Sequence, residues 1–234
     1  MTGNRPTDDP TAAREILAHS GIVLLDFDGP VCSVFDGISA RDVAHQLRAF
    51  LIADHQSPFE LAHLETDDPF EVLNHARSFG IKHSAIVEEK LCSLELEAVA
   101  TARPTPGTEQ LIKEWHDTGL CVAIVSNNST AAVSAYMETH SLMTFVQGIF
   151  ARTGANFDNL KPSPYLVETA LTALNAPSSQ AVLVGDSVAD IKAARAAGVR
   201  SIGYANKSHK AEQLAAAGAH AVIYDMAQLA TLAK

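Results

Sequence analysis

The chain has 234 residues, of which 47% are hydrophobic and 19% are charged, so its composition is that of a globular protein and not of a disordered or fibrous chain. Its 27 acidic residues exceed its 17 basic residues and give a formal net charge of −10. This balance argues against a nucleic-acid partner, which requires a basic face, and it means that an anionic ligand has to be held by a local positive site. The length predicts one large domain or one domain with an insert.

The cysteines and the N-terminal residues indicate where the protein works. Cys32, Cys92 and Cys121 are too few and too scattered for a disulfide framework or a CxxC metal site. The first ten residues are polar and do not resemble the apolar segment of an export signal. The longest apolar run near the start covers residues 22–25, far short of the ~20 residues that span a bilayer. We therefore expect a cytoplasmic protein without a membrane partner.

Four continuous runs of aliphatic and β-branched residues predict strands, and they cover residues 22–25, 122–125, 181–184 and 221–224. A run without polar alternation is typical of a strand buried on both faces of a parallel sheet. Helical stretches precede and separate these runs, at residues 11–19, 109–118, 130–139, 164–174 and 190–197. Gly119 and Gly198 stand where two of the helices are expected to end. The alternation predicts an α/β fold with a Rossmann-like parallel sheet flanked by helices.

Residues 36–104 break this alternation and predict a small all-helical insert after the first core strand. Two apolar helical faces support the prediction, with no strand-like run between them. Their residues are Val43, Leu47, Phe50 and Leu51 on one face and Val87, Leu91, Leu94 and Ala98 on the other. The segment Pro104 to Gly107 marks the return to the core. We therefore expect a core domain of residues 1–35 and 105–234 and a helical domain of residues 36–104.

Polar residues follow three of the predicted strands. The first strand ends in Asp26-Phe27-Asp28-Gly29, the second in Ser126-Asn127-Asn128, and a later one in Gly185-Asp186-Ser187-Val188-Ala189-Asp190. Ligands of open α/β sheets bind outside these carboxyl ends. Acids that converge there repel each other unless a divalent cation lies among them, and carboxylates with open positions favour Mg²⁺. Lys161, in the loop before the next helix, and the hydroxyl of Ser126 are then the groups that hold an anionic oxygen.

Each of these signals has a plain structural explanation when it stands alone. Asp-Gly is a common turn, Ser-Asn-Asn serves as a helix N-cap, Gly-Asp-Ser begins a helix, and Lys-Pro carries no information. All four occur here in order, each at the end of a strand or the start of a helix. Together they favour a functional site.

At these residues the sequence resembles the haloacid dehalogenase superfamily, and within it the Mg²⁺-dependent phosphatases that have a helical cap of the first type. The resemblance covers residues 20–225, with the cap at the position of the helical insert. Its four motifs match the segment Asp26 to Val31, Ser126-Asn127, Lys161-Pro162 and the segment Gly185 to Asp190. The departure is Pro30, where the family more often has Thr or Val. We expect Pro30 to stiffen the turn and leave the chemistry intact.

The resemblance implies a phosphomonoester hydrolase that acts on a small phosphorylated metabolite. Asp26 would attack phosphorus as the nucleophile and form an aspartyl-phosphate. Asp28 would protonate the leaving oxygen and then deprotonate the water that hydrolyses the intermediate. Gly29 belongs to the same motif and supports it.

The resemblance also implies the ligands of the metal and of the phosphate. Mg²⁺ would be held by Asp26, the main-chain carbonyl of Asp28 and Asp186, while Asp190 shapes the outer shell. The phosphoryl oxygens would be bound by Ser126, the amide of Asn127 and Lys161.

Asp28 separates the branches of this superfamily. Displacement of halide from carbon requires no acid at that position, and phosphonate-cleaving members lack this Asp, so both activities are disfavoured. A sugar phosphomutase of the same cap class keeps both acids and stays an alternative. A non-catalytic binding module is the other alternative, although the loss of Asp26 or Asp28 would be its expected signature.

The segment Leu64 to Pro69 lies between two predicted insert helices, where related caps carry a substrate-specificity loop. Asp68, Pro69 and Glu71 have the pattern of an N-cap, a first-turn proline and a capping-box partner. Glu65 and Asp67 have no such role, and if they face the site they favour a neutral or amine-bearing phosphomonoester over a bisphosphate or phosphoglycolate. The nearby cationic residues that would reverse this preference are Arg41, His45, Lys82 and His83. The sequence determines neither the individual substrate nor the oligomeric state.

Overall fold

The structure, a computed structural model, describes residues 9–53 and 59–230. Its six-stranded main sheet consists of β1 (Ile22–Leu25), β4 (Cys121–Ser129), β5 (Gly148–Arg152), β6 (Ala181–Gly185), β7 (Arg200–Tyr204) and β8 (Ala221–Ile223). The strands are parallel and lie in the order β5-β4-β1-β6-β7-β8. In the centre, Leu25 of β1 pairs with Ile124 of β4 and Val184 of β6. The predicted α/β fold with a parallel sheet is confirmed.

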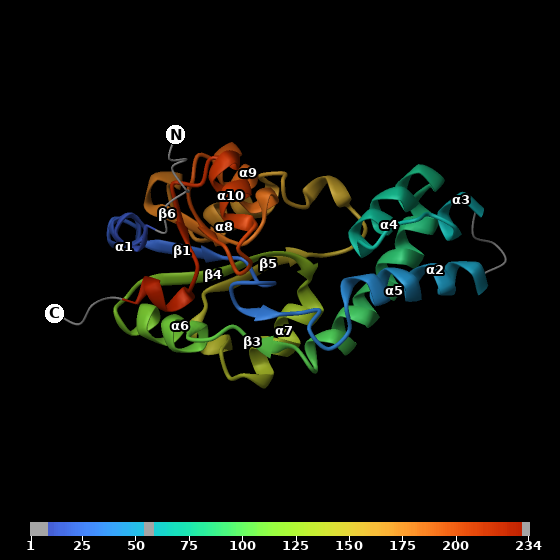
Figure 1. Cartoon of the computed structure of the whole chain (residues 1–234), viewed down its shortest axis with the longest axis horizontal. Coiled ribbons are helices and arrows are strands. Elements are labelled where there is room, and N and C mark those ends of the chain that lie inside the picture. The colour runs from blue at the N-terminus through green and yellow to red at the C-terminus, as the bar shows by residue number, and fades with distance from the viewer. Residues whose placement is uncertain (1–8, 54–58, 231–234) are drawn as a thin grey trace.

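Helices cover both faces of this sheet, with α8 and α9 on one side and α6 and α7 on the other (Figure 1). The helices of the core are α1 (Pro10–Ala18), α6 (Thr108–Asp117), α7 (Thr130–Thr139), α8 (Tyr165–Ala173), α9 (Val188–Ala196) and α10 (Lys210–Ala217). Successive strand residues point to opposite faces. Val23 and Leu25 therefore share one buried cluster with α1, α6 and α7, whereas Leu24 shares another with α8 and α9. Burial on both faces explains why the strand sequences are continuously apolar.

The structure differs from the prediction at several element boundaries. β5 and β7 were not predicted, because each contains a glycine and an arginine that interrupt the apolar run. β4 continues to Ser129, beyond the expected end at residue 125, because Ser126 and Ser129 still pair with β5. α9 begins two residues earlier than expected because Ser187 caps it. Polar residues that were expected after the second strand therefore lie within it.

The segment between the short antiparallel strands β2 (Cys32–Ser33) and β3 (Arg103–Pro104) is called here the helical insert, and its described residues form four α-helices. They are α2 (Ala40–Ala53), α3 (Phe59–Ala62), α4 (Pro69–Ala76) and α5 (Ile81–Val99). These helices lie beyond one end of the sheet and bury a core of their own (Figure 1). Phe50 is 38% exposed and lies opposite Lys90, so its predicted place on the buried face of α2 is wrong.

Short 3₁₀ helices complete the described elements. They are η1 (Arg77–Phe79), η2 (Met143–Phe145), η3 (Phe157–Asn159), η4 (Ser178–Gln180) and η5 (Met226–Leu229). Across residues 9–53 and 59–230, none of the helices is long and apolar enough to cross a membrane.

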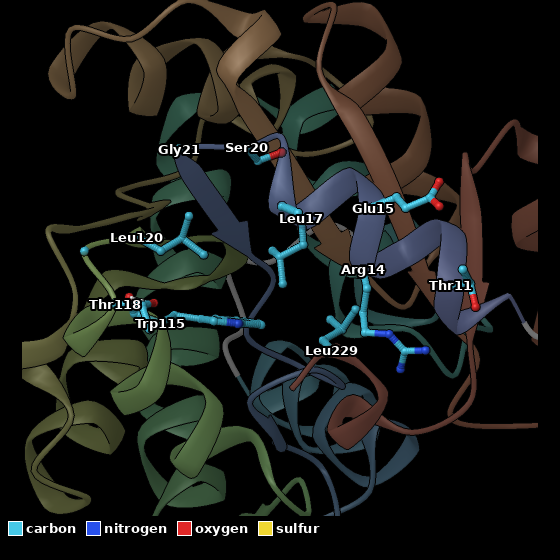
Figure 2. A pocket seen from close by; sticks show the side chains of 12 residues that line it. Thr11, Arg14, Glu15, Leu17, Ser20, Gly21, Trp115, Thr118, Leu120 and Leu229 are labelled. Atoms are coloured by element: carbon cyan, nitrogen blue, oxygen red, sulfur yellow. Dashed lines mark hydrogen bonds between the residues drawn. The ribbon is translucent and has the colours of Figure 1, made fainter. Parts of the chain in front are cut away.

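An apolar hollow of about 690 Å³ lies where β1 and β4 begin. Leu17, Trp115, Leu120 and Leu229 give it hydrophobic walls, and Arg14 lies at its rim (Figure 2). The predicted acids follow the opposite, carboxyl ends of the strands. This hollow is therefore separate from the place where the sequence predicts chemistry.

Candidate active site

The carboxyl ends of β1, β4 and β6 bring the sequence-predicted residues to one edge of the sheet. They line one pocket of about 310 Å³, together with Lys161 from the loop before α8. The lining residues are Asp26, Asp28, Asp68, Phe70, Ser126, Asn127, Asn128, Phe157, Lys161, Asp186, Ser187 and Ala189. The two predicted supporting residues are not in this lining: Gly29 lies against Asp186, and Asp190 contacts Lys161.

Lys161 connects two acids to the C-terminal part of β4. Its Nζ lies 2.6 Å from Oδ1 of Asp26 and 2.6 Å from Oδ1 of Asp190, and it donates to the main-chain oxygen of Val125 at 2.9 Å. Its amide donates to Oδ1 of Asn127 at 2.8 Å, and its carbonyl accepts from Nδ2 of the same side chain at 3.0 Å. These reciprocal bonds hold the lysine at a fixed position in the pocket although it is distant in sequence.

Burial and mutual contact determine the charges of Asp26, Asp190 and Lys161. Burial raises the pKa of Asp26 well above its ordinary value, Asp190 raises it further, and Lys161 offsets only part of the effect. Burial also opposes ionisation of Asp190, but Lys161 outweighs it and lowers the pKa of that carboxyl. Burial opposes the charge on Lys161 as well, yet Asp190 and Asp26 together raise its pKa. One permanently charged ammonium is thus shared by two acids, and a further cation would favour the ionised form of Asp26.

Three carboxylates in the described part of the chain are close enough to share a cation. Asp26, Asp186 and Asp190 place oxygens within 4.8 Å of one another. Hard oxygen donors of this kind suit Mg²⁺, which takes one or two carboxylates together with water and phosphate. These residues therefore fit the ion. Asp190 lies in this cluster, although it was predicted only to shape the outer shell, and the carboxylate of Asp28 lies outside it.

Two residues that the sequence analysis missed hold Asp186. Its Oδ2 accepts a hydrogen bond from Nδ2 of Asn206 at 2.9 Å and another from the ammonium of Lys210. Asn206 and Lys210 follow β7, a strand that the sequence did not predict. No local pattern connects them to the acids, so only the structure could find them.

Asp28 and Gly29 have positions that the local turn explains. Oδ1 of Asp28 accepts a hydrogen bond from the amide of Val34 at 2.9 Å. Burial raises the pKa of Asp28 to about 6, and the Val34 amide opposes this rise. A carboxyl group with such a pKa can both give and take a proton. Gly29 has a φ of 101°, and a Cβ there would lie 2.5 Å from Cγ of Asp186, so the turn requires glycine.

A buried ion pair, also missed, supports the segment that follows Ser126. Arg152 of β5 donates from Nε to the main-chain oxygen of Asn127 at 2.9 Å and pairs with Glu95 of α5 at 2.5 Å. Glu95 also accepts from the amide of Ser129 at 2.9 Å and from Nδ2 of Asn128 at 3.2 Å. Glu95 is 0% exposed and Arg152 3%. The sequence signal that could have revealed this ion pair is Glu95, a charged residue on the apolar face of α5.

The loop before α4 contributes Asp68 and Phe70 to the pocket. Asp67 instead forms an exposed ion pair with Arg41 at 2.8 Å, and the hydrogen bond from that guanidinium holds the pKa of Asp67 below its usual value. Glu65 is exposed and is not part of the lining. Of the acids in this loop, Asp68 therefore lies at the site, where the sequence analysis had considered Glu65 and Asp67. The cationic candidates Arg41, His45, Lys82 and His83 are not among the lining residues.

The start of α4 follows the predicted pattern only in part. Asp68 is the N-cap and accepts from the amide of Phe70 at 2.8 Å, and Pro69 occupies the first turn. The predicted capping box is wrong, because the amide of Asp68 donates to Oγ1 of Thr66 at 3.1 Å, and the Thr66 hydroxyl in turn bonds to Glu71. Thr66 therefore connects Asp68 to Glu71, in place of the direct hydrogen bond that a capping box requires.

Comparison with known proteins places this site in a family. The curated phosphoglycolate phosphatase of Pseudomonas fluorescens is 25% identical over 165 residues, which are 68% of this chain and 60% of that protein. The chloroplastic protein SUPPRESSOR OF QUENCHING 1 of Arabidopsis thaliana is 31% identical over 199 residues, which are 82% of this chain and 18% of that protein. The chain thus spans less than two thirds of the length of these relatives.

A solved structure has the same fold. It is a variant of CbbY from Rhodobacter sphaeroides in complex with xylulose-(1,5)bisphosphate, with a TM-score of 0.65 and 22% identity over 91% of this chain and 97% of that chain. The family model for haloacid dehalogenase-like hydrolases matches residues 23–204. These residues include the helical insert and every strand-end residue that the sequence predicted, so the chain belongs to the haloacid dehalogenase-like hydrolase family.

Proposed function

We propose that this chain is a phosphatase that hydrolyses small phosphomonoesters with the help of Mg²⁺. The observation that carries the proposal is the single pocket in which Asp26, Asp28, Lys161 and Asp186 meet at the carboxyl ends of the strands. The name of the phosphoglycolate phosphatase relative supports hydrolysis of a phosphate ester.

In the proposed reaction Asp26 is the nucleophile. One of its carboxylate oxygens attacks phosphorus, the bond from phosphorus to the alcohol oxygen breaks, and an aspartyl-phosphate forms. Asp28 gives its proton to the departing alcohol oxygen. It then takes a proton from the water that attacks phosphorus, which releases inorganic phosphate and restores Asp26. Its pKa of about 6 suits both proton transfers.

The phosphoryl group is held by polar groups from β4 and by the ammonium from the loop before α8. The ammonium of Lys161 lies next to the nucleophile, so it can neutralise charge that develops on the phosphoryl oxygens. The Ser126 hydroxyl and the amide of Asn127 supply further donors. Arg152 and Lys161 both bond to Asn127 and hold it in place before the substrate arrives, and the Ser126 hydroxyl is positioned by its hydrogen bonds with Asn128.

Asp26, Asp186 and the main-chain oxygen of Asp28 are the groups proposed to hold Mg²⁺, with Asp190 nearby. When bound, the ion supplies positive charge that lessens repulsion between the acids and the incoming phosphate. The fit rests on the three carboxylates that lie within 4.8 Å of one another.

Turnover of p-nitrophenyl phosphate, with Mg²⁺ and with EDTA, tests the proposal, and a panel of phosphorylated metabolites extends it. We expect hydrolysis that depends on Mg²⁺ and disappears in the Asp26→Asn variant. A sugar 1-phosphate that is converted into its 6-phosphate, without release of phosphate, would identify a mutase instead. No metal-dependent turnover on any substrate would contradict the proposal and favour a binding module.

A further inference from the structure

The part of the pocket that the proposed chemistry does not use is formed by α4 of the helical insert and by η3. Asp68 and Phe70 lie at the N-terminal end of α4, and Phe157 lies at the start of η3. Since Ser126 and Lys161 hold the phosphoryl group in the proposed function, these three side chains of the insert side are placed to meet the rest of the substrate.

The charge of the pocket is unfavourable for a second anion. Among its described lining residues Lys161 is the basic one, and it is already bound to Asp26 and Asp190. Asp68 adds a carboxylate from the helical insert, and its Oδ1 accepts a hydrogen bond from the Phe70 amide. Lys210, the ammonium next to the pocket, is bound to Asp186.

Arg48 donates to the main-chain oxygens of Leu64 and Thr66 in the loop before α4, and the two arginines that face the rings of this wall are also engaged. Arg77 lies 5.9 Å from the centroid of the Phe157 ring and pairs with Asp158 at 2.6 Å. Arg152 lies 5.7 Å from the centroid of the Phe70 ring, and its guanidinium is bound by Glu88 and Glu95. Neither arginine lines the pocket. A phosphate or carboxylate on the leaving group would therefore meet two phenyl rings and a carboxylate.

We infer that Asp68 determines the substrate class: the site takes phosphomonoesters whose leaving alcohol carries an ammonium or hydroxyl group and no second anion. This inference rests on the proposed phosphatase function. An ammonium or hydroxyl group donates to the Asp68 carboxylate, whereas a carboxylate or second phosphate is repelled by it. The structure thus predicts that phosphoglycolate is a poor substrate of this chain.

Two substrates of equal length and opposite charge test the inference. O-phosphoethanolamine and phosphoglycolate share a phosphate ester on a two-carbon frame, and the first ends in an ammonium where the second ends in a carboxylate. Asp68 is exposed, and a charge contact near a protein surface contributes about 1.4 kcal/mol or more, so we expect kcat/KM in the wild type to favour phosphoethanolamine by at least about tenfold. The ratio should fall to near one in Asp68→Asn, since asparagine still caps the helix but has no charge.

Asp67→Asn is the matched control, because it removes a neighbouring acid that pairs with Arg41 away from the pocket. Its ratio should equal that of the wild type. A wild-type preference for phosphoglycolate, or a ratio that Asp68→Asn leaves unchanged, would overturn the inference. So would equal effects of the two variants.

Binding measurements separate this inference from the proposed phosphatase function. The probes are 2-aminoethylphosphonate, which ends in an ammonium, and phosphonoacetate, which ends in a carboxylate. Neither has an ester bond that the enzyme could hydrolyse, and the binding of each is measured by titration calorimetry with Mg²⁺ present. Tighter binding of 2-aminoethylphosphonate that Asp68→Asn abolishes supports the inference even if no ester is turned over. Equal binding of the two phosphonates, or binding of neither, contradicts it whatever the enzyme assay shows.

Discussion

Glu95, on the last helix of the helical insert, accepts a hydrogen bond from the amide of Ser129 at 2.9 Å. Ser129 in turn caps α7, its side chain accepting from the amide of Ala132. Because Arg152 joins the same carboxylate and also holds the carbonyl of Asn127, the insert is tied by a buried charge to the segment that we propose binds phosphate. Removal of the Glu95 charge should therefore lower both the stability and the activity of the protein.

Glu95→Ala should destabilise the protein by about 3–5 kcal/mol, because it leaves Arg152 buried with only part of its pairing. It should also lower kcat/KM through the loss of support for Asn127. Urea unfolding and steady-state kinetics measure the two effects. Glu97→Ala, at an exposed position of the same helix, should stay within about 0.5 kcal/mol of the wild type. Equal stability of the two variants would show that the buried pair contributes nothing.

Asp26→Asn should abolish turnover, by at least about a thousandfold, while the protein stays folded. An amide oxygen cannot replace the carboxylate as the nucleophile, and binding energy cannot compensate for the lost step. Phosphate release measures activity, and circular dichroism checks the fold. If a tenth of the wild-type rate remained, with deamidation excluded by mass spectrometry, Asp26 could not be the nucleophile.

Asp28→Asn should affect substrates according to their leaving groups. An alkyl phosphate requires a proton on the departing oxygen, whereas p-nitrophenolate leaves with little help, so the alkyl substrate should lose at least about tenfold more activity. Kinetics on one alkyl and one aryl phosphate measure the difference. Equal losses on both would argue against Asp28 as the acid. Asp36→Asn, on an exposed residue of the following loop, is the control and should leave both rates unchanged.

EDTA should abolish activity, and Mg²⁺ but not Ca²⁺ should restore it, because Ca²⁺ prefers a looser shell of 6–8 oxygens. Asp186→Asn should raise the Mg²⁺ concentration needed for half-maximal activity by about tenfold or more. Mg²⁺ should also raise the unfolding temperature of the wild type, and this shift should be smaller in Asp186→Asn. Asp117→Asn, at the exposed end of α6, should behave like the wild type. Full activity in Ca²⁺ or in EDTA would contradict the metal site.

Gly29→Ala should lower kcat/KM by at least about tenfold, because the added Cβ would lie 2.5 Å from Cγ of Asp186 and force that acid to move. Gly80→Ala is the matched control, since Gly80 has a similar φ of 97° with nothing within 4 Å of the added Cβ. Both variants should lose about 1–2 kcal/mol of stability from the left-handed backbone. Only Gly29→Ala should lose activity, and an equal loss in both would show that the approach to Asp186 is unimportant.

The strand-end residues could be predicted because local sequence places them. Asp26 and Asp28 are covalently fixed to the end of β1, and Asp186 to the end of β6. A continuous apolar run predicts a central parallel strand, and parallel strands end at one edge of the sheet, so these acids must meet there. Lys161 could be assigned from its motif, although its contact with Asp26 and Asp190 depends on the fold.

The tertiary structure decided which residues support the candidate site and which acid of the insert loop lines the pocket. Glu95 and Arg152 are 57 residues apart in the sequence. Lys210, which bonds to Asp186, begins the helix after β7, a strand that has no clear apolar run. In the insert loop, Arg41 of α2 pairs with Asp67 and Asp68 lines the pocket. Adjacent acids are alike in sequence, and the packing of α2 against α4 determines which one lines the pocket, because a loop side chain takes its direction from the partners that the fold brings to it.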